Sequence, residues 1–330
     1  MKTKYKKILM IFSIIILTAI VITIMPTRKS IKVNEWLEYR NNLGRPLICA
    51  HRGGANLNPE NTEMAFDYVV NNKLADIIEI DIKLTKDEQI VIIHDNSIND
   101  LALDDNLPSL YVNDLTYEEL KKYNYGRNFV DINGNTPYRD YTIDQAKNAG
   151  LSIMLLSEFL EKYESYDIKV LIEIKDKDEI AKKVADQVMN MLEGKYNSWQ
   201  KDSMIISFND EIISYITKKY PNQLTGALGY KIILEIATNI LNLDSIHKAK
   251  YSSIQTSMSH DLGIIDIKCA TKRFVKKVHK RNQTIAFFTI DNEEDMKYLI
   301  SIGADIITTD SPHLLKKIMI EENYYEDSNN

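Results

Sequence analysis

Acidic side chains in a strand-like segment are the residues of this chain most suited to chemistry. Glu79 and Asp81 stand two residues apart in the run 77–82, whose other members are all isoleucine. Because the side chains of a strand alternate between its two faces, the two carboxylates share one face and three isoleucines take the other. An acidic face on an otherwise apolar strand makes a poor core, so the pattern predicts a metal site.

A second segment, 170–175, repeats the pattern with Glu173 and Lys175. If the two segments are neighbouring strands, three carboxylates meet at one place, where they repel one another and lose hydration. A divalent cation resolves this repulsion. Three hard oxygen ligands with open positions suit Ca²⁺ or Mg²⁺ rather than Zn²⁺.

Basic and imidazole side chains accompany the carboxylates. Arg52 and Lys175 add two positive charges to the three carboxylates and the dication, so the predicted site keeps one net positive charge. That charge suits a monoanion such as a phosphodiester. His51 and His94 could serve as general acid and base, and each such role typically contributes about 10² to 10⁴ in rate.

Each of these residues also has a simpler explanation. A single histidine at a strand end is more often structural than catalytic, and Glu79 and Asp81 could form the solvated face of an antiparallel strand. Lys175 could only neutralise the neighbouring glutamate, and Arg52 could be a structural ion pair. Glu60 could be an acid stabilised by the dipole of the helix expected after it.

Alternating strand-like and helical segments must position these side chains. Eight segments have the composition of core strands, and helical periods lie between most of them; the strands are expected at 47–51, 77–82, 170–175, 204–208, 225–229, 253–256, 284–290 and 305–309. This alternation predicts a (β/α)₈ TIM barrel, an α/β fold whose active residues lie at the carboxyl ends of the strands. An open doubly wound sheet is less consistent, because the segment 51–55 is not its Gly-rich phosphate loop.

The connection after the second core strand is unusually long. A turn at 86–89 leads to an extra strand at 90–94 that should form a hairpin with the second core strand, and a polar, tyrosine-rich stretch follows. We predict an insertion at about 96–165, with a short capped helix after residue 114.

The amino-terminal 30 residues differ in composition from the rest. Residues 8–25 are 18 residues without a charge, and they follow four lysines. Such a helix would span about 27 Å, roughly one bilayer core. A cleaved signal peptide is the alternative, but the apolar run is long for one and lacks a small-x-small cleavage pattern.

We therefore predict a basic segment and transmembrane anchor at 1–30 and a barrel domain at 31–330. Because Arg28, Lys29 and Lys32 follow the apolar run, the excess of positive charge before it is small. That excess favours a single-pass protein of the cell membrane with the catalytic domain outside the cytoplasm.

Composition excludes other classes of protein. The net charge of −6 argues against a nucleic-acid partner, which usually binds a basic surface. Two cysteines cannot form a disulfide framework.

These motifs, taken together and in their order along the chain, resemble those of the glycerophosphodiester phosphodiesterase family. The resemblance covers most of residues 46–315 and rests on His51-Arg52-Gly53, Pro59-Glu60-Asn61-Thr62, Glu79-Ile80-Asp81, Thr85-Lys86-Asp87, His94-Asp95, Glu173-Ile174-Lys175, Ser207-Phe208 and Thr309-Asp310-Ser311-Pro312. It implies a TIM barrel in which the site residues have four roles: metal ligands Glu79, Asp81 and Glu173, acid–base pair His51 and His94, phosphate ligands Arg52 and Lys175, and Glu60 lining the site.

The resemblance implies cleavage of a glycerophosphodiester to glycerol 3-phosphate and an alcohol, through a cyclic phosphate formed by a glycerol hydroxyl. The segment 287–291 carries Phe287 and Phe288 where many relatives have a tryptophan, which leaves the specificity for the alcohol open. A lysophospholipase D or phosphatidylinositol-cleaving activity on membrane lipids is one alternative. A barrel that binds envelope polymers such as teichoic acid without cleaving them is another.

Overall fold

The computed structural model describes residues 13–14, 17, 27–29, 34–103, 107–240, 250–261 and 266–325. In this part of the chain no helix is long and apolar enough to cross a membrane. The transmembrane anchor predicted within 1–30 falls almost wholly outside the described residues, and the domain division at residue 30 stays a prediction.

Eight parallel strands close into a barrel in the described part of the chain. The strand β1 pairs with both β2 and β12, which closes the ring. Around the ring the strands are β1 (Leu47–Ala50), β12 (Ile306–Thr309), β11 (Thr284–Phe287), β8 (Ser253–Thr256), β7 (Leu224–Ala227), β6 (Ser203–Ile206), β5 (Lys169–Ile174) and β2 (Ile77–Leu84). The predicted TIM barrel is therefore confirmed.

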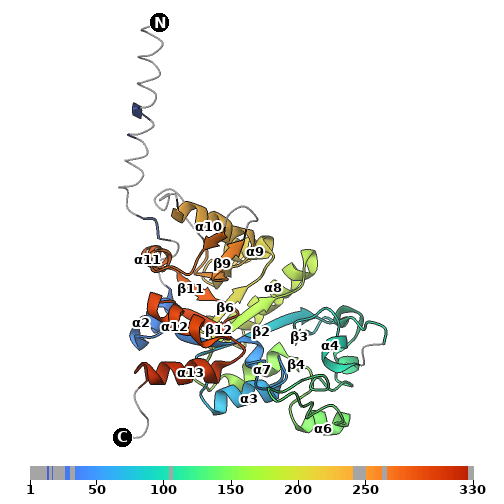
Figure 1. Cartoon of the computed structure of the whole chain (residues 1–330). Helices are drawn as coiled ribbons and strands as arrows, with labels where there is room; N and C mark the ends of the chain where they lie inside the picture. Colours follow the sequence, from blue (N-terminus) through green and yellow to red (C-terminus); the bar gives the residue numbers. More distant parts are fainter. Residues whose placement is uncertain are drawn as a thin grey trace.

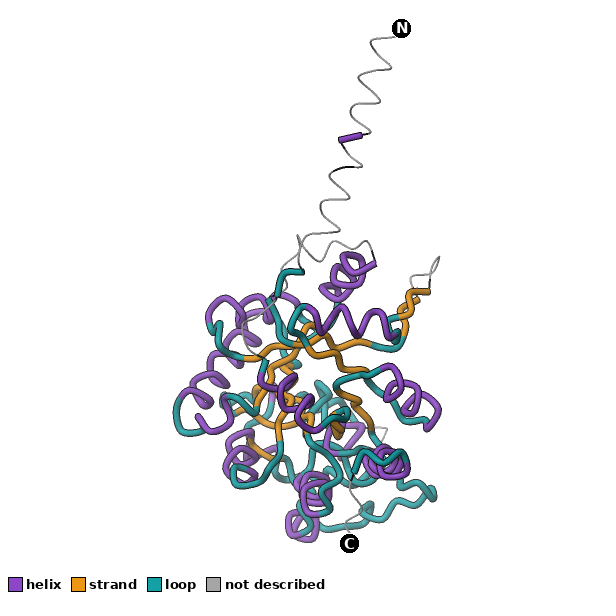
Figure 2. Tube along the Cα trace, turned by 90° about the vertical axis from the view of Figure 1, so that its left-hand side faces the viewer, coloured by secondary structure: helices purple, strands orange, loops and turns teal. Residues whose placement is uncertain are grey.

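Helices surround the strands, as Figures 1 and 2 show. The covering helices are α3 (Glu63–Asn71), α7 (Leu156–Tyr163), α8 (Asp178–Glu193), α9 (Asp210–Lys219), α10 (Tyr230–Ile240), α11 (Lys272–Lys280), α12 (Glu293–Ile302) and α13 (Pro312–Glu321). Gly303 ends α12 with a left-handed φ of 82°, as its position in the sequence predicts.

The barrel has apolar side chains both inside and outside its wall. Residues of β2 and β5 that point outward pack against α3, α7 and α8. The helix α2 (Glu35–Leu43) precedes β1, and its Trp36 is fully buried among inward-pointing residues such as Leu47 and Leu171. Trp36 thus fills the amino-terminal end of the barrel, which leaves the carboxyl ends of the strands for a site.

The predicted extra strand and the predicted insertion both lie between β2 and β5, and together they are called the insertion from here on. The strand β3 (Ile90–Ile92) runs antiparallel to the end of β2, and β4 (Met154–Leu155) runs antiparallel to β3. Short helices complete it: α4 (Asn99–Ala102), η2 (Val112–Asp114), α5 (Tyr117–Leu120) and α6 (Ile143–Asn148). Thr116 and Glu119 form the capping box expected at the start of α5. The insertion has a hydrophobic cluster of its own, so it packs as a separate unit beside the barrel.

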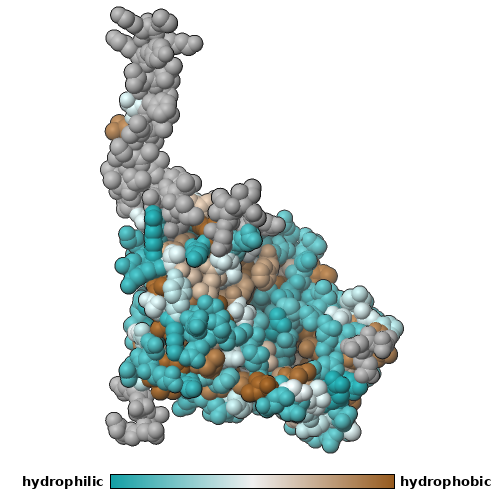
Figure 3. Space-filling view, in the orientation of Figure 1, coloured by the Kyte–Doolittle hydropathy of each residue, from teal (hydrophilic) through white to brown (hydrophobic). Residues whose placement is uncertain are grey.

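Two further elements belong to the connections of the barrel. A short hairpin of β9 (Ser259–Asp261) and β10 (Asp266–Lys268) follows β8, and η3 (Asn197–Gln200) precedes β6. On the face of the molecule seen in Figure 1, the surface over the helices is largely hydrophilic (Figure 3).

Candidate active site

Three carboxylates from two neighbouring strands meet at the carboxyl end of the barrel. Asp81 of β2 lies directly beside Glu173 of β5 in the parallel register, and Glu79 is on the same face of β2. One oxygen of each residue lies within 4.8 Å of the other two. The side chains are 3%, 1% and 7% exposed for Glu79, Asp81 and Glu173 respectively. The convergence predicted from alternation in the two segments is therefore confirmed.

The electrostatics of this group favour a bound cation. Burial raises the pKa of Glu79, and the charge of Asp81 raises it further, to about 8. Burial and the charge of Asp81 also raise the pKa of Glu173. Among the described residues, Asp81 Oδ1 is buried without a hydrogen-bond donor. The cation nearest to this oxygen is Lys175 Nζ, at 3.5 Å. Buried carboxylates that repel one another, one of them with an oxygen that accepts no hydrogen bond, fit a divalent cation held by oxygen ligands.

Two residues with left-handed backbone, both in the connection between β1 and α3, orient two of the carboxylates. Arg52, in the 3₁₀ turn η1 (His51–Gly53), has a φ of 51°, and its backbone N–H donates to Glu79 Oε2 over 2.8 Å. Asn61 has a φ of 55°, and its side-chain amide donates to Asp81 Oδ2 over 3.0 Å. A Cβ at Gly53 would come within 2.8 Å of the Phe66 ring, so only glycine fits there. Left-handed backbone is costly for residues other than glycine, and such strain concentrates at functional sites.

Arg52 and Lys175 both lie at the site and are paired with its carboxylates. Arg52 Nη1 contacts both oxygens of Glu60, at 2.9 and 3.0 Å, and Arg52 Nε lies 3.3 Å from Asp81. Lys175 Nζ donates to Glu173 over 2.8 Å and lies 3.5 Å from Asp81. Glu60 precedes Thr62, the N-cap of α3, and binds Arg52 rather than the helix terminus.

Both predicted histidines line the same cavity, and each is held by an aspartate. The Nδ1 atom of His51 lies 2.7 Å from Asp310, and the Nδ1 atom of His94 lies 2.7 Å from Asp95. Burial by itself would lower the pKa of His51, but the hydrogen bond with Asp310 and the charge of Glu79 raise it to about 9. An aspartate on Nδ1 fixes the ring and leaves Nε2 for a reacting group.

Asp95 and Asp310 belong to the sequence motifs, but no role was predicted for either residue. Asp310 directly follows β12, which is the neighbour of β1, whose end carries His51. The signal that could have identified Asp310 is therefore the position of an acid at the carboxyl end of the strand beside the first histidine.

Asp310→Asn should lower kcat by about 10- to 100-fold and leave KM nearly unchanged, because the asparagine still contacts the ring but no longer stabilises its charge. Loss of the carboxylate lowers the pKa of His51, so the limb of the pH–rate profile that reports this residue should move to lower pH. Steady-state kinetics from pH 5 to 10 measure both effects. An unchanged profile would show that Asp310 has only a structural role.

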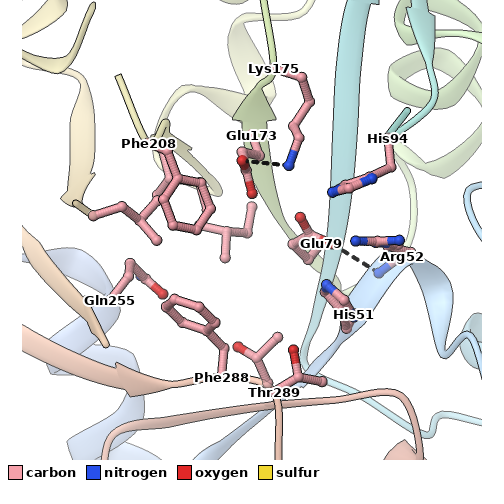
Figure 4. A pocket seen from close by; sticks show the side chains of 14 residues that line it. His51, Arg52, Glu79, His94, Glu173, Lys175, Phe208, Gln255, Phe288 and Thr289 are labelled. Atoms are coloured by element: carbon pink, nitrogen blue, oxygen red, sulfur yellow. Dashed lines mark hydrogen bonds and ion pairs between the residues drawn. The ribbon is translucent and has the colours of Figure 1, made fainter. Parts of the chain in front are cut away.

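The cavity at the site has a volume of about 220 Å³ and two chemically distinct sides. Figure 4 shows the histidines, Arg52, Glu79 and Lys175 on one side and Phe208 and Phe288 opposite them. The two phenylalanine rings meet edge to face at 6.3 Å, and Phe208 is 56% exposed. The cavity therefore offers charged groups to an anion and an apolar wall to the group attached to it.

The fold and the site define a class of protein: TIM-barrel enzymes with an acidic site suited to a divalent cation. In this chain the site combines three clustered, buried carboxylates with two histidines that are each held by an aspartate. The model of the Glycerophosphoryl diester phosphodiesterase family matches residues 51–314. The chain therefore belongs to this family. The family, the class of enzyme and the hydrolysis of glycerophosphodiesters, all predicted from the motifs, are confirmed by this match and by the relatives below.

Two related proteins align with this chain over almost their whole length. The chain is 29% identical over 279 residues to a glycerophosphodiester phosphodiesterase of Bacillus altitudinis, covering 83% of this chain and 98% of the relative. It is 28% identical over 273 residues to a glycerophosphodiester phosphodiesterase of Caldanaerobacter subterraneus subsp. tengcongensis, covering 82% and 96%.

Solved structures share the fold. A putative glycerophosphoryl diester phosphodiesterase from Silicibacter pomeroyi DSS-3 superposes with a TM-score of 0.66 at 18% identity, covering 88% of this chain and 98% of that one. An Oleispira antarctica phosphodiesterase in complex with sn-glycerol-3-phosphate gives a TM-score of 0.60 at 18% identity, covering 84% and 98%.

Proposed function

We propose that Glu79, Asp81 and Glu173 hold one divalent cation, Ca²⁺ or Mg²⁺, and that the two histidines move the protons in the hydrolysis of a glycerophosphodiester. The observation that supports this proposal is the group of three buried carboxylates within 4.8 Å of one another. When bound, the cation would withdraw charge from the phosphate oxygens and so stabilise the transition state.

Arg52 and Lys175 are proposed to bind the phosphate. Each is paired with carboxylates at the cavity, so each lies within reach of an anion placed there. Glu60 holds the guanidinium of Arg52 at two oxygens and thereby sets its direction. A dication on the three carboxylates would also weaken their hold on Lys175, which frees its ammonium group for a phosphate oxygen.

The proton transfers are proposed for the two imidazoles, because both line the cavity. One histidine takes the proton of a glycerol hydroxyl as its oxygen attacks phosphorus. The other gives a proton to the departing alcohol as its bond to phosphorus breaks. In the second step the roles reverse, and water opens the cyclic phosphate to sn-glycerol 3-phosphate. An attacking group within the substrate needs no second molecule to be placed, so proximity contributes to the rate.

The proposal for the amino terminus rests on sequence. The apolar run 8–25 after four lysines is proposed to anchor the chain as a single span of the cell membrane, with the barrel outside the cytoplasm. Lipids and envelope polymers with a glycerophosphate unit would then be within reach, as well as small diesters.

A panel of substrates tests the proposed chemistry. The full chain should release sn-glycerol 3-phosphate from glycerophosphocholine, glycerophosphoethanolamine or glycerophosphoglycerol. An excess of EDTA should abolish the release, and Ca²⁺ or Mg²⁺ should restore it. Full activity in EDTA after extensive dialysis would contradict the role given to the three carboxylates.

A lysophospholipid is the second candidate substrate, because the exposed Phe208 and the adjoining Phe288 provide an apolar wall beside the charged groups. The same panel decides between the two when it includes a lysophosphatidylcholine. A kcat/KM for the lysolipid above that for glycerophosphocholine would identify a lysophospholipase D, and the reverse order would identify a diesterase for deacylated substrates.

A further inference from the structure

The helix α11 carries an unusual concentration of positive charge. Its nine residues, Lys272–Lys280, include six basic and no acidic side chains. The whole chain has a net charge of −6, so this helix opposes the charge of the molecule. Phe274, Val275 and Val278 are buried in the hydrophobic core, which fixes the helix on the barrel. The basic side chains are therefore displayed by a rigid element.

Four of the basic residues share one side of the helix. Lys272, Arg273, Lys276 and Lys280, called the basic face below, are all exposed. At 3.6 residues per turn their positions span about 100° of the helix circumference, and the buried apolar residues lie on the other side. His279 is outside this group, because its Nε2 contacts the buried Asp305 at 2.8 Å.

The lysines of the basic face differ from several lysines on other helices. On α8, α9 and α12, Lys182, Lys183, Lys219 and Lys297 each pair with a carboxylate. Within the described ranges, no carboxylate lies within ion-pair distance of Lys272, Lys276 or Lys280. Unneutralised positive charges on one side of a rigid helix can act together on an anionic surface.

The structure also places α11 beside the point where the chain enters the barrel. The Asn34 side chain donates to the backbone oxygens of Ser252, at 2.8 Å, and Asn282, at 3.2 Å. Asn282 lies two residues after the end of α11. Only residues 26–33 separate Asn34 from the apolar run 8–25, and this stretch includes Arg28, Lys29 and Lys32. Fully extended, it spans at most about 28 Å.

We propose that the basic face of α11 binds the anionic headgroups of the membrane that holds the amino-terminal apolar run. This inference rests on the membrane anchor of the proposed function. The short connection keeps the end of α11 near the bilayer, and anionic lipids in the outer leaflet, which the barrel faces, would attract clustered Lys and Arg side chains. The acidic remainder of the chain is repelled by the same lipids, so the basic face sets which side of the barrel meets the membrane. The insertion, attached to β2 on the opposite side of the ring, then points away from it.

Lysine reactivity on vesicles tests this proposal. The full chain is reconstituted in phosphatidylcholine vesicles, or in vesicles with one quarter phosphatidylglycerol, and exposed lysines are acetylated and quantified by mass spectrometry. On the anionic vesicles, Lys272, Lys276 and Lys280 should react at least about fivefold more slowly than on the neutral ones. The difference should vanish in 1 M salt, where the Debye length is about 3 Å. Lys182 and Lys183 of α8 and Lys218, an exposed lysine in the last turn of α9, provide the control within the same molecule.

Equal reactivity of the basic-face lysines on the two kinds of vesicle would overturn the proposal. So would protection of these lysines by soluble poly(glycerol phosphate) without any protection by anionic vesicles, which would identify a polymer as the partner. The variant K272Q/K276Q/K280Q should hydrolyse soluble glycerophosphocholine at the parent rate, which shows that it is folded. It should lose the preference for anionic vesicles, which is the tighter binding of the parent to anionic than to neutral vesicles. The matched variant K182Q/K183Q/K218Q should keep that preference.

Flotation separates this proposal from the anchor on which it rests. The anchored chain floats with neutral vesicles through its apolar run, whether or not α11 binds lipid. If the chain fails to float with neutral vesicles, the anchor is wrong. In that case, flotation with anionic vesicles that the K272Q/K276Q/K280Q variant loses would still support the basic face, and its absence would refute both.

Discussion

The substitution Glu79→Gln is expected to lower the rate of diester hydrolysis by about 10³ or more, since a cation at such a site typically supplies several kcal/mol. The amide is nearly the same size as the carboxylate, and its oxygen can still accept the hydrogen bond that Arg52 N–H gives to Glu79. The change therefore removes the charge of a proposed cation ligand with little disturbance of the packing. Steady-state kinetics and calorimetric titration with Ca²⁺ or Mg²⁺ measure the losses of rate and of cation affinity.

The same variant should be at least as stable as the parent when no metal is present. Burial and the charge of Asp81 raise the pKa of Glu79 from 4.5 to about 8. Between these two pH values the carboxyl group of Glu79 keeps its proton in the folded parent and has lost it in the unfolded chain. The free energy of unfolding of the parent therefore falls as pH rises through this window. The variant lacks this loss, so its advantage in Tm should be larger at pH 9 than at pH 5.

Thermal unfolding in EDTA at the two pH values checks this expectation. Glu38→Gln, at an exposed carboxylate of α2 far from the cavity, is the control and should change neither rate nor Tm. A variant at position 79 that lost stability in EDTA at pH 9 would show that this carboxylate supports the fold and is not held there for a cation.

The substitution His51→Ala should reduce kcat by about 10² to 10⁴, the usual contribution of a general acid or base. His51 is held by Asp310 and lines the cavity, and no oxygen ligand of the three-carboxylate group is removed by the change. Affinity for the cation should therefore stay close to that of the parent. This separation of rate from metal affinity distinguishes His51→Ala from the variant at position 79.

Kinetics with glycerophosphocholine and calorimetric titration of the cation measure the two quantities for His51→Ala. The matched control is His313→Ala, at an exposed histidine on α13 outside the cavity. A His51→Ala enzyme within threefold of the parent rate would exclude this imidazole from the proton transfers.

Much of the fold followed from local patterns. Each of the eight core strands was predicted at its place because alternating or continuous β-branched residues are bounded by polar turns. The larger errors are at the carboxyl ends, since the amino ends differ by at most one residue. The strand expected to reach Phe208 ends at Ile206, and the one expected to reach Ile290 ends at Phe287. Polar and aromatic residues continue the strand pattern there, but the chain has already turned into the loops that form the cavity.

The site was predictable where strand periodicity alone positions a side chain, and less so where loops meet. The alternation in β2 and β5 brought out Glu79, Asp81 and Glu173. The contact between His51 and Asp310 joins residues 259 positions apart, and no local pattern encodes it. The charge count from sequence also omitted Glu60, which the structure places on Arg52. With Glu60 included, the cation-bound site is neutral before its histidines are counted.

The length of β2 gives the two imidazoles separate supports. The first part of β2 pairs with β1 and β5, and its last three residues pair with β3 of the insertion. Ile93 N–H donates to the backbone oxygen of Asp81 over 2.8 Å, so the residue before His94 is held to the backbone of a residue whose side chain lies in the site. His51 directly follows a barrel strand, whereas His94 lies at the start of the insertion, which has its own hydrophobic cluster.

This division makes the enzyme modular. The three carboxylates and His51 are held by the barrel strands and the turn after β1, so a change confined to the insertion would leave them in place. A packing fault around Val91 would act differently, because the β-ladder would transmit the displacement to His94 and misalign it with His51, the other member of the proposed acid–base pair, without disturbing the barrel.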